Sequence, residues 1–106
     1  MERRVFERLH AKLQAKLYYG EMTYTGTVIN LSENGMFICS RMNIPVDSMF
    51  PLVLLQNGQS FKMDVRVKRA VRTCVNHKDM EEPGIGVMLL NPPQDYIEFV
   101  GKCRPL

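Results

Sequence analysis

The 106-residue sequence has no tryptophan, only two histidines and only three cysteines, Cys39, Cys74 and Cys103. No two cysteines show C-x-x-C spacing and the histidines do not complete a zinc pattern, so no metal site is predicted. We expect the cysteines to be reduced, partly buried thiols in a reducing compartment. The carboxylates form no recognisable catalytic pair, and no Ser/His/Asp or Cys/His order indicates a nucleophile. The sequence therefore predicts a protein that is not an enzyme.

Long apolar runs are absent as well. No stretch approaches the roughly 18 apolar residues of a membrane span, and the N-terminus lacks the apolar run of a signal peptide. Internal repeats and low-complexity segments are also missing. Residues 1–106 are therefore predicted to form one cytoplasmic domain.

Acidic residues are scarce around two basic clusters, at residues 3–8 and 62–72, although the net charge is only +3. Such clusters favour an anionic partner, with a solvated basic face as the ordinary alternative. For the second cluster we prefer the solvated face. Arg69 and Arg72 would border a ligand site only if the strand that carries them bends.

Hydrophobic and polar residues alternate through most of the chain, which is the pattern of half-buried strands. Gly26, inside one such segment, predicts a bulge or a close backbone approach. Asn57-Gly58 suits positive φ and predicts a hairpin turn. The segment after it is long for one strand, so we expect a bend or bulge near Arg69-Ala70. The predicted strands cover residues 12–20, 22–31, 36–40, 50–56, 61–75 and 85–90, with a charged loop at 76–84.

The segment NPPQDYIEFVGKC has the period of an amphipathic helix, predicted over residues 92–104. Asn91 is expected to cap it, with Pro92 first and Gln94 completing a capping box. Its apolar face consists of Tyr96, Phe99, Val100 and Cys103. Six sequential strands followed by a helix predict a mainly all-β fold. Closing the antiparallel sheet into a barrel of residues 12–91 would hide its edges.

The first basic cluster is RRVFER, residues 3–8. Arg4 and Arg8 are four residues apart and project to one side whether the segment is helical or extended. An arginine fork bonds phosphate or a guanine edge, so two forks suit one anionic ligand, and Arg3 would hold a second phosphate or base. Residues 1–11 are predicted to form a mobile arm. From charge spacing alone, a solubilising charge run is the preferred interpretation.

A second polar stretch, NLSENG, begins where the second predicted strand ends. Asn30 and Ser32 are predicted to project from one face, where an amide and a hydroxyl can read the edge of a base. Gly35 offers positive φ for a tight turn and lets a ligand approach the backbone. Taken alone, this stretch is better interpreted as an ordinary hairpin turn whose side chains bond the local backbone.

Together the two stretches form R-x-x-x-R followed by N-x-S-x-x-G, and this pair resembles the PilZ domain family. The rest of the chain is similar in register: AKLQAKLYYG resembles the first strand of the family, TGTVINLSENGMFICS the second and third, and GIGVMLLNPPQDYIEFV the last strand and closing helix. The resemblance covers nearly the whole chain.

The resemblance implies a six-stranded antiparallel β-barrel that binds cyclic di-GMP and needs no other cofactor. Arg4 and Arg8 would clasp phosphates and a guanine edge. Asn30 and Ser32 would hydrogen-bond a guanine, and Gly35 would permit the turn.

The residue before the motif, Arg3, stands where the family tends to influence whether one or two ligand molecules bind. Binding would order the arm across the barrel and present a new surface to a protein partner in motility, pilus or biofilm control. The alternatives are a PilZ-like adaptor that does not bind the ligand and a small-barrel binder of single-stranded nucleic acid. The apolar helix face leaves both a monomer and a homodimer open.

Overall fold

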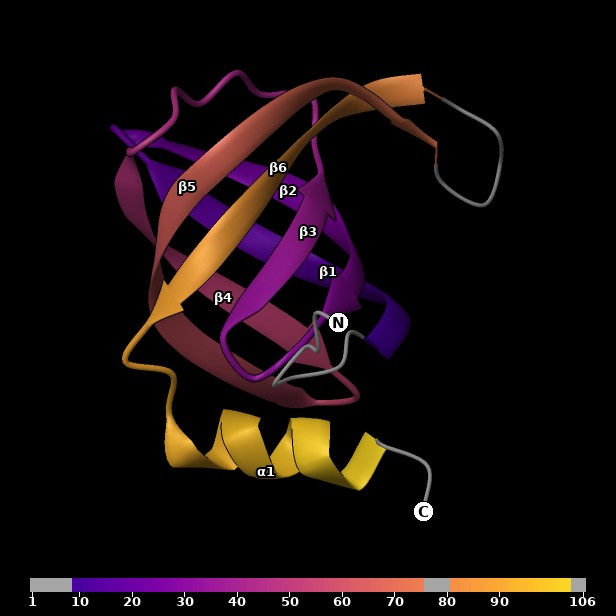
Figure 1. The fold of residues 1–106 in the computed structure, drawn as a ribbon. Coiled ribbons are helices and arrows are strands. Elements are labelled where there is room, and N and C mark those ends of the chain that lie inside the picture. The colour runs from indigo at the N-terminus through magenta and orange to yellow at the C-terminus, as the bar shows by residue number, and fades with distance from the viewer. Residues whose placement is uncertain (1–8, 76–80, 104–106) are drawn as a thin grey trace, which may run out of the picture.

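A computed structural model describes residues 9–75 and 81–103 of the chain. In that part six strands close into an antiparallel barrel in the order β1-β2-β3-β6-β5-β4, and the helix α1 lies across one end (Figure 1). The predicted six-stranded barrel with a C-terminal helix is confirmed. The elements are β1 (Leu9–Tyr19), β2 (Met22–Leu31), β3 (Gly35–Cys39), β4 (Met49–Gln56), β5 (Gln59–Val75), β6 (Glu81–Leu90) and α1 (Gln94–Cys103).

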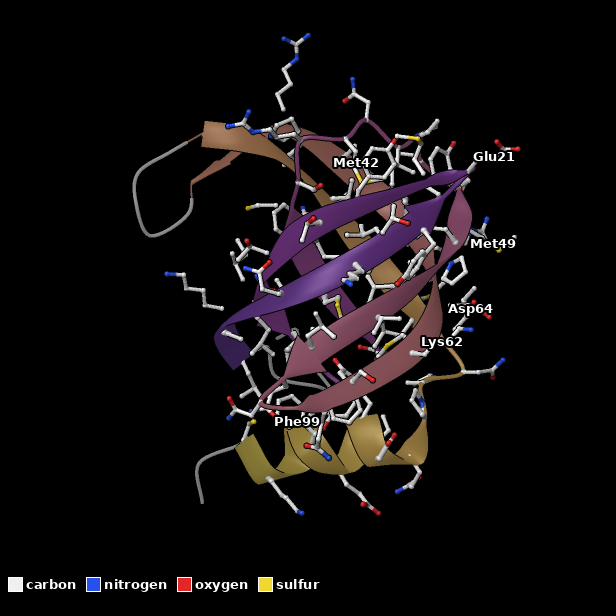
Figure 2. The ribbon with its side chains drawn as sticks, turned by 180° about the vertical axis from the view of Figure 1, so that it is seen from behind. Glu21, Met42, Met49, Lys62, Asp64 and Phe99 are labelled. Carbon is white, nitrogen blue, oxygen red and sulfur yellow. The ribbon has the colours of Figure 1, made fainter. Side chains whose placement is uncertain are left out.

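Alternating side chains fill the barrel, as the hydrophobic pattern predicts. In β1, Ala15 and Leu17 are fully buried, whereas Lys16 between them is exposed. Tyr96 and Val100 of α1 are also fully buried and close one end of this core. Figure 2 shows Met42 and Met49 toward the opposite end from Phe99 and the helix. The barrel therefore has a helix end and a far end.

The largest differences from the predicted strands are at the starts of β1 and β6, which begin three and four residues earlier than their sequence pattern predicts. β1 starts at Leu9, where it pairs with Leu31 of β2. β6 starts at Glu81, which pairs with Val75, so residues 81–84 belong to the sheet rather than to the predicted loop. Backbone hydrogen bonds between strands do not depend on side-chain polarity, which explains why a charged segment continues the ladder.

The predicted irregular positions agree with the structure more closely than the predicted strand starts do. A methyl group at Gly26 would lie 2.6 Å from Cγ2 of Ile38, so the predicted close approach is confirmed. Asn57 and Gly58 have φ of 44° and 82°, as a tight hairpin turn requires. The register of β5 shifts between Val67 and Arg69, one residue before the predicted bend.

The helix begins later than predicted and has a different first turn. The amides of Tyr96 and Ile97 donate to the carbonyl of Pro93, at 3.0 and 3.2 Å, and α1 starts at Gln94. Asn91 has φ of 56°, whereas an N-cap residue is extended, so the prediction of an Asn91 cap is wrong. The helix described in this part of the chain is too short to cross a membrane.

The cysteines differ from the prediction of reduced, partly buried thiols. Cys39 is buried and disulfide-bonded. Cys103 is free but exposed, although it was expected on the apolar face of the helix. Spacing along the chain could not show this, because the fold decides which residues meet and which helix face stays covered.

Candidate ligand-binding site

The first motif residue that the structure describes, Asn30, begins a row of directly opposed residues across four strands. Asn30 of β2 pairs with Phe37 of β3, Phe37 pairs with Gly86 of β6, and Gly86 pairs with Arg69 of β5. The backbone of β1 pairs with this row at His10, opposite Asn30. Residues opposite one another in a sheet lie on the same face, so Asn30, Phe37, Gly86 and Arg69 share one side of the barrel wall.

That side is the outer one. Met36 and Ile38, which flank Phe37, are fully buried in the core, whereas Phe37 is partly exposed. Because neighbouring residues of a strand point to opposite faces, Phe37 faces outward. The row therefore forms a platform on the barrel surface, which we call the outer row.

Two β-bulges set which residues join the outer row. Val28 and Leu31 are both buried although they are three residues apart, which a regular strand forbids. The register shift between Val28 and Asn30 reconciles them and leaves Asn30 outside. In β5, Val67 is fully buried and Arg69 would follow it inward, but the register shift after Val67 turns Arg69 to the surface.

The absent side chain of Gly86 lets Arg69 reach across β6. A Cβ atom at Gly86 would lie 3.3 Å from Cγ and 3.4 Å from Nε of Arg69, and 3.6 Å from Cδ1 of Phe37. The Arg69 guanidinium accordingly lies over the Phe37 ring, with Cζ 5.7 Å from its centroid. At this distance the cation is attracted by the ring face.

The turn that carries the rest of the motif is held by short hydrogen bonds. The Ser32 amide donates to the Gly35 carbonyl at 2.9 Å, and the Ser32 hydroxyl donates to Oδ1 of Asn34 at 3.1 Å. The Ser32 carbonyl accepts a 2.6 Å hydrogen bond from the buried hydroxyl of Tyr96 in α1. The side chain of Ser32 is only 2% exposed. The Ser32 hydroxyl also donates to the Gly35 carbonyl at 3.4 Å, which is the bond to the local backbone that the sequence offered as the alternative for Ser32.

Gly35 lies at the edge of a surface pocket. It is the first residue of β3 and is not among the described residues with positive φ, so that part of the prediction is wrong. The pocket, with a volume of about 280 Å³, is also lined by Lys68, Arg69 and Gly86. Close approach of a ligand to the Gly35 backbone stays a prediction, and the pocket walls carry two cationic side chains.

The three arginines of the first motif, Arg3, Arg4 and Arg8, lie outside the described residues. Their attachment point is described, because Arg8 immediately precedes Leu9, which pairs with Leu31 beside the outer row. The structure thus brings together Asn30, Ser32 and Gly35, and it starts β1 next to them.

Some residues of this site were not identified from the sequence. Phe37 and Gly86 had no local signal beyond a glycine within a strand pattern, and Lys68 was assigned to a solvated face. Arg69 was considered only as a residue that a bend in its strand would bring near the site. Among residues 9–75 and 81–103, no group of three or more His, Cys, Asp or Glu residues forms a metal site.

The tyrosines of the β1–β2 hairpin differ in their exposure. Tyr19 packs edge-on against Phe50 with ring centroids 5.9 Å apart. Of the described large apolar side chains, Tyr18 is among those that are exposed, at 37%.

A family model described as the PilZ domain matches residues 2–100 of the chain. Among solved structures, the PilZ domain with c-di-GMP of YcgR from Escherichia coli superposes with a TM-score of 0.75 at 16% identity, covering 95% of this chain and 88% of that one. No curated protein matches the sequence significantly.

Two longer proteins contain the same fold. The Bacillus subtilis inhibitor of motility MotI/DgrA matches with a TM-score of 0.76 at 12% identity, over 94% of this chain and 48% of its own. The K. pneumonia MrkH–c-di-GMP complex matches with a TM-score of 0.76 at 13% identity, over 96% and 51%. The chain thus spans about half the length of these two proteins, and at such identities the likeness establishes the fold.

Proposed function

Because the chain belongs to the PilZ domain family, we propose that it is a receptor for cyclic di-GMP rather than an enzyme. One observation carries the proposal: the strand that follows the arginine motif pairs, at His10, directly with Asn30 of the second motif. The strand that follows the arginine motif thus starts beside the second motif, although the two motifs are about twenty residues apart in the sequence. A ligand with two phosphates and two guanines needs both a cationic clasp and a polar platform.

In this proposal the arm supplies the clasp. Arg4 and Arg8 bind phosphate oxygens and the Hoogsteen edge of a guanine through their paired donors. Asn30 bonds the edge of a guanine, and Gly35 lets the ligand approach the backbone beside the pocket. Ser32 contributes an acceptor lone pair while its hydrogen holds the turn. Arg3 determines whether a second ligand molecule is taken up.

In this proposal, binding of the ligand acts on a partner by ordering the arm. Neutralising its arginines fixes the arm across the barrel and creates a surface for a protein partner in the cytoplasm. Structural neighbours include an inhibitor of motility and a transcription regulator, so a partner in motility, pilus or biofilm control is consistent with this proposal.

The test is calorimetric titration of cyclic di-GMP into the wild-type protein and into Arg8→Ala. We expect binding in the wild type and affinity at least about tenfold weaker in the variant, because a charged partner of the phosphate is lost. Arg41→Ala is the matched control. Arg41 is an exposed arginine that follows Cys39, at the end of β3 opposite to Gly35. It should bind like the wild type.

Absence of binding in the folded wild-type protein would reject the receptor proposal and favour an adaptor that acts without the nucleotide. A salt-dependent interaction with single-stranded oligonucleotides of any sequence would instead indicate a nucleic-acid binder.

A further inference from the structure

We propose that Arg69 is a ligand-binding residue outside both motifs, and that its guanidinium stacks on the face of the guanine whose edge Asn30 bonds. The inference rests on the proposed function and deepens it, because it extends the site from β2 across β6 to β5. It also implies that Gly86, which has no side chain, leaves room for the Arg69 side chain to cross β6.

Two features of the neighbouring strands determine where the Arg69 side chain lies. A bulge turns Arg69 out of the core pattern, and the bare backbone of Gly86 gives its side chain a path to Phe37. The contact with the Phe37 ring restrains a side chain that is otherwise long and flexible. Restraining the side chain before the ligand arrives lowers the entropy lost on binding.

The guanidinium is also available to a ligand. Arg69 is exposed, and no ion pair or hydrogen bond joins it to another residue in the described ranges. Its guanidinium carbon lies 5.7 Å from the centroid of the Phe37 ring, and a planar guanidinium can also stack on a flat partner such as a base.

A base can lie between Arg69 and Asn30. Arg69 reaches across β6 toward Phe37 of β3, and Phe37 is directly opposed to Asn30 of β2. A purine held there can direct its edge to the Asn30 amide and its face to Arg69. Gly35 and Arg69 line the same pocket, which places the turn of the motif at the border of this arrangement.

The experiment compares Arg69→Ala and Arg69→Lys with the wild type in calorimetric titrations of cyclic di-GMP. Arg69→Ala should weaken binding at least about fivefold, since stacking contributes substantially to the binding of a base. Arg69→Lys should weaken binding similarly, because lysine keeps the charge but has no plane to stack. Arg41→Ala again serves as the control and should bind normally.

Gly86→Ala tests the path of the side chain independently. The added methyl group should displace Arg69 and weaken binding in the wild-type background, but it should change affinity little in the Arg69→Ala background. Thermal melting of each variant checks that it is folded at the temperature of the titration.

Wild-type affinity in Arg69→Ala would overturn the inference, and full affinity in Arg69→Lys would replace stacking by a simple charge effect. In both cases loss of binding in Arg8→Ala would leave the receptor proposal standing. If the wild-type protein does not bind cyclic di-GMP, the receptor proposal itself fails.

Discussion

At the scale of single residues, two glycines have opposite surroundings, one crowded and one open. Gly26 lies where β2 approaches β3 closely, and a methyl group there would meet Ile38 at 2.6 Å and the carbonyl oxygen of Cys39 at 3.2 Å. Gly101 lies in α1 with nothing within 4 Å of its missing Cβ. The sequence shows a glycine in each case, and only the surroundings distinguish them.

We expect Gly26→Ala to lower the free energy of unfolding by about 1–3 kcal/mol, because the backbone carbonyl of Cys39 cannot move aside as a side chain can. Chemical denaturation with urea measures the change. An unchanged denaturation midpoint would show that the barrel wall adapts to the methyl group at no cost.

Gly101→Ala should instead raise the free energy of unfolding by about 0.5–1 kcal/mol, since alanine restricts the unfolded chain and suits a helix interior. The same denaturation experiment reports it, with Gly26→Ala as the comparison of opposite sign. Destabilisation would mean that this end of α1 needs a glycine for a reason outside the described contacts.

At the scale of elements, α1 is joined to the motif turn by Tyr96. Its hydroxyl donates to the Ser32 carbonyl at 2.6 Å, and its ring packs edge-on against Phe61 at 5.9 Å between centroids. Phe61 in turn stacks on Phe99, with centroids 5.3 Å apart. A helix at the end of the barrel thus holds the loop that follows β2.

Tyr96→Phe keeps the aromatic packing and removes one hydrogen bond. The buried Ser32 carbonyl loses a donor, so we expect the free energy of unfolding to fall by about 1–3 kcal/mol. Tyr18→Phe is the control, because Tyr18 is 37% exposed and its hydroxyl can be solvated by water. Equal stability of the two variants would contradict a structural role for the Tyr96 hydroxyl.

At the scale of the whole molecule, the strands form one closed ladder. β1 pairs with both β2 and β4, so the first strand closes the barrel that the later strands build. A ligand that binds only this folded ladder stabilises all of it by mass action.

We therefore expect cyclic di-GMP at about 100 times its dissociation constant to raise the free energy of unfolding by about 2.7 kcal/mol. Thermal melting with and without the nucleotide measures the shift, and Arg8→Ala at the same concentration should shift less. A wild-type melting temperature that ignores the ligand would contradict binding to the folded state.

The features that depend on near neighbours in the chain were predictable from the sequence. Alternating side chains identified the strands, Asn57-Gly58 a hairpin turn, and Gly26 a close approach, because each follows from local sterics and from a period of two. The pair of motifs identified the family, and with it the closed barrel.

Which residues share the candidate site, and which residues hold them in place, depends on the tertiary fold. The alternation of Val65 and Val67 would continue inward at Arg69, and a bulge paired against β6 reverses it. The start of α1 at Gln94, the entry of residues 81–84 into β6 and the disulfide at Cys39 likewise depend on partners distant in the chain. These features could not be predicted because register, bulges and cross-links are set by which strands the barrel brings together, and sequence periodicity does not contain that information.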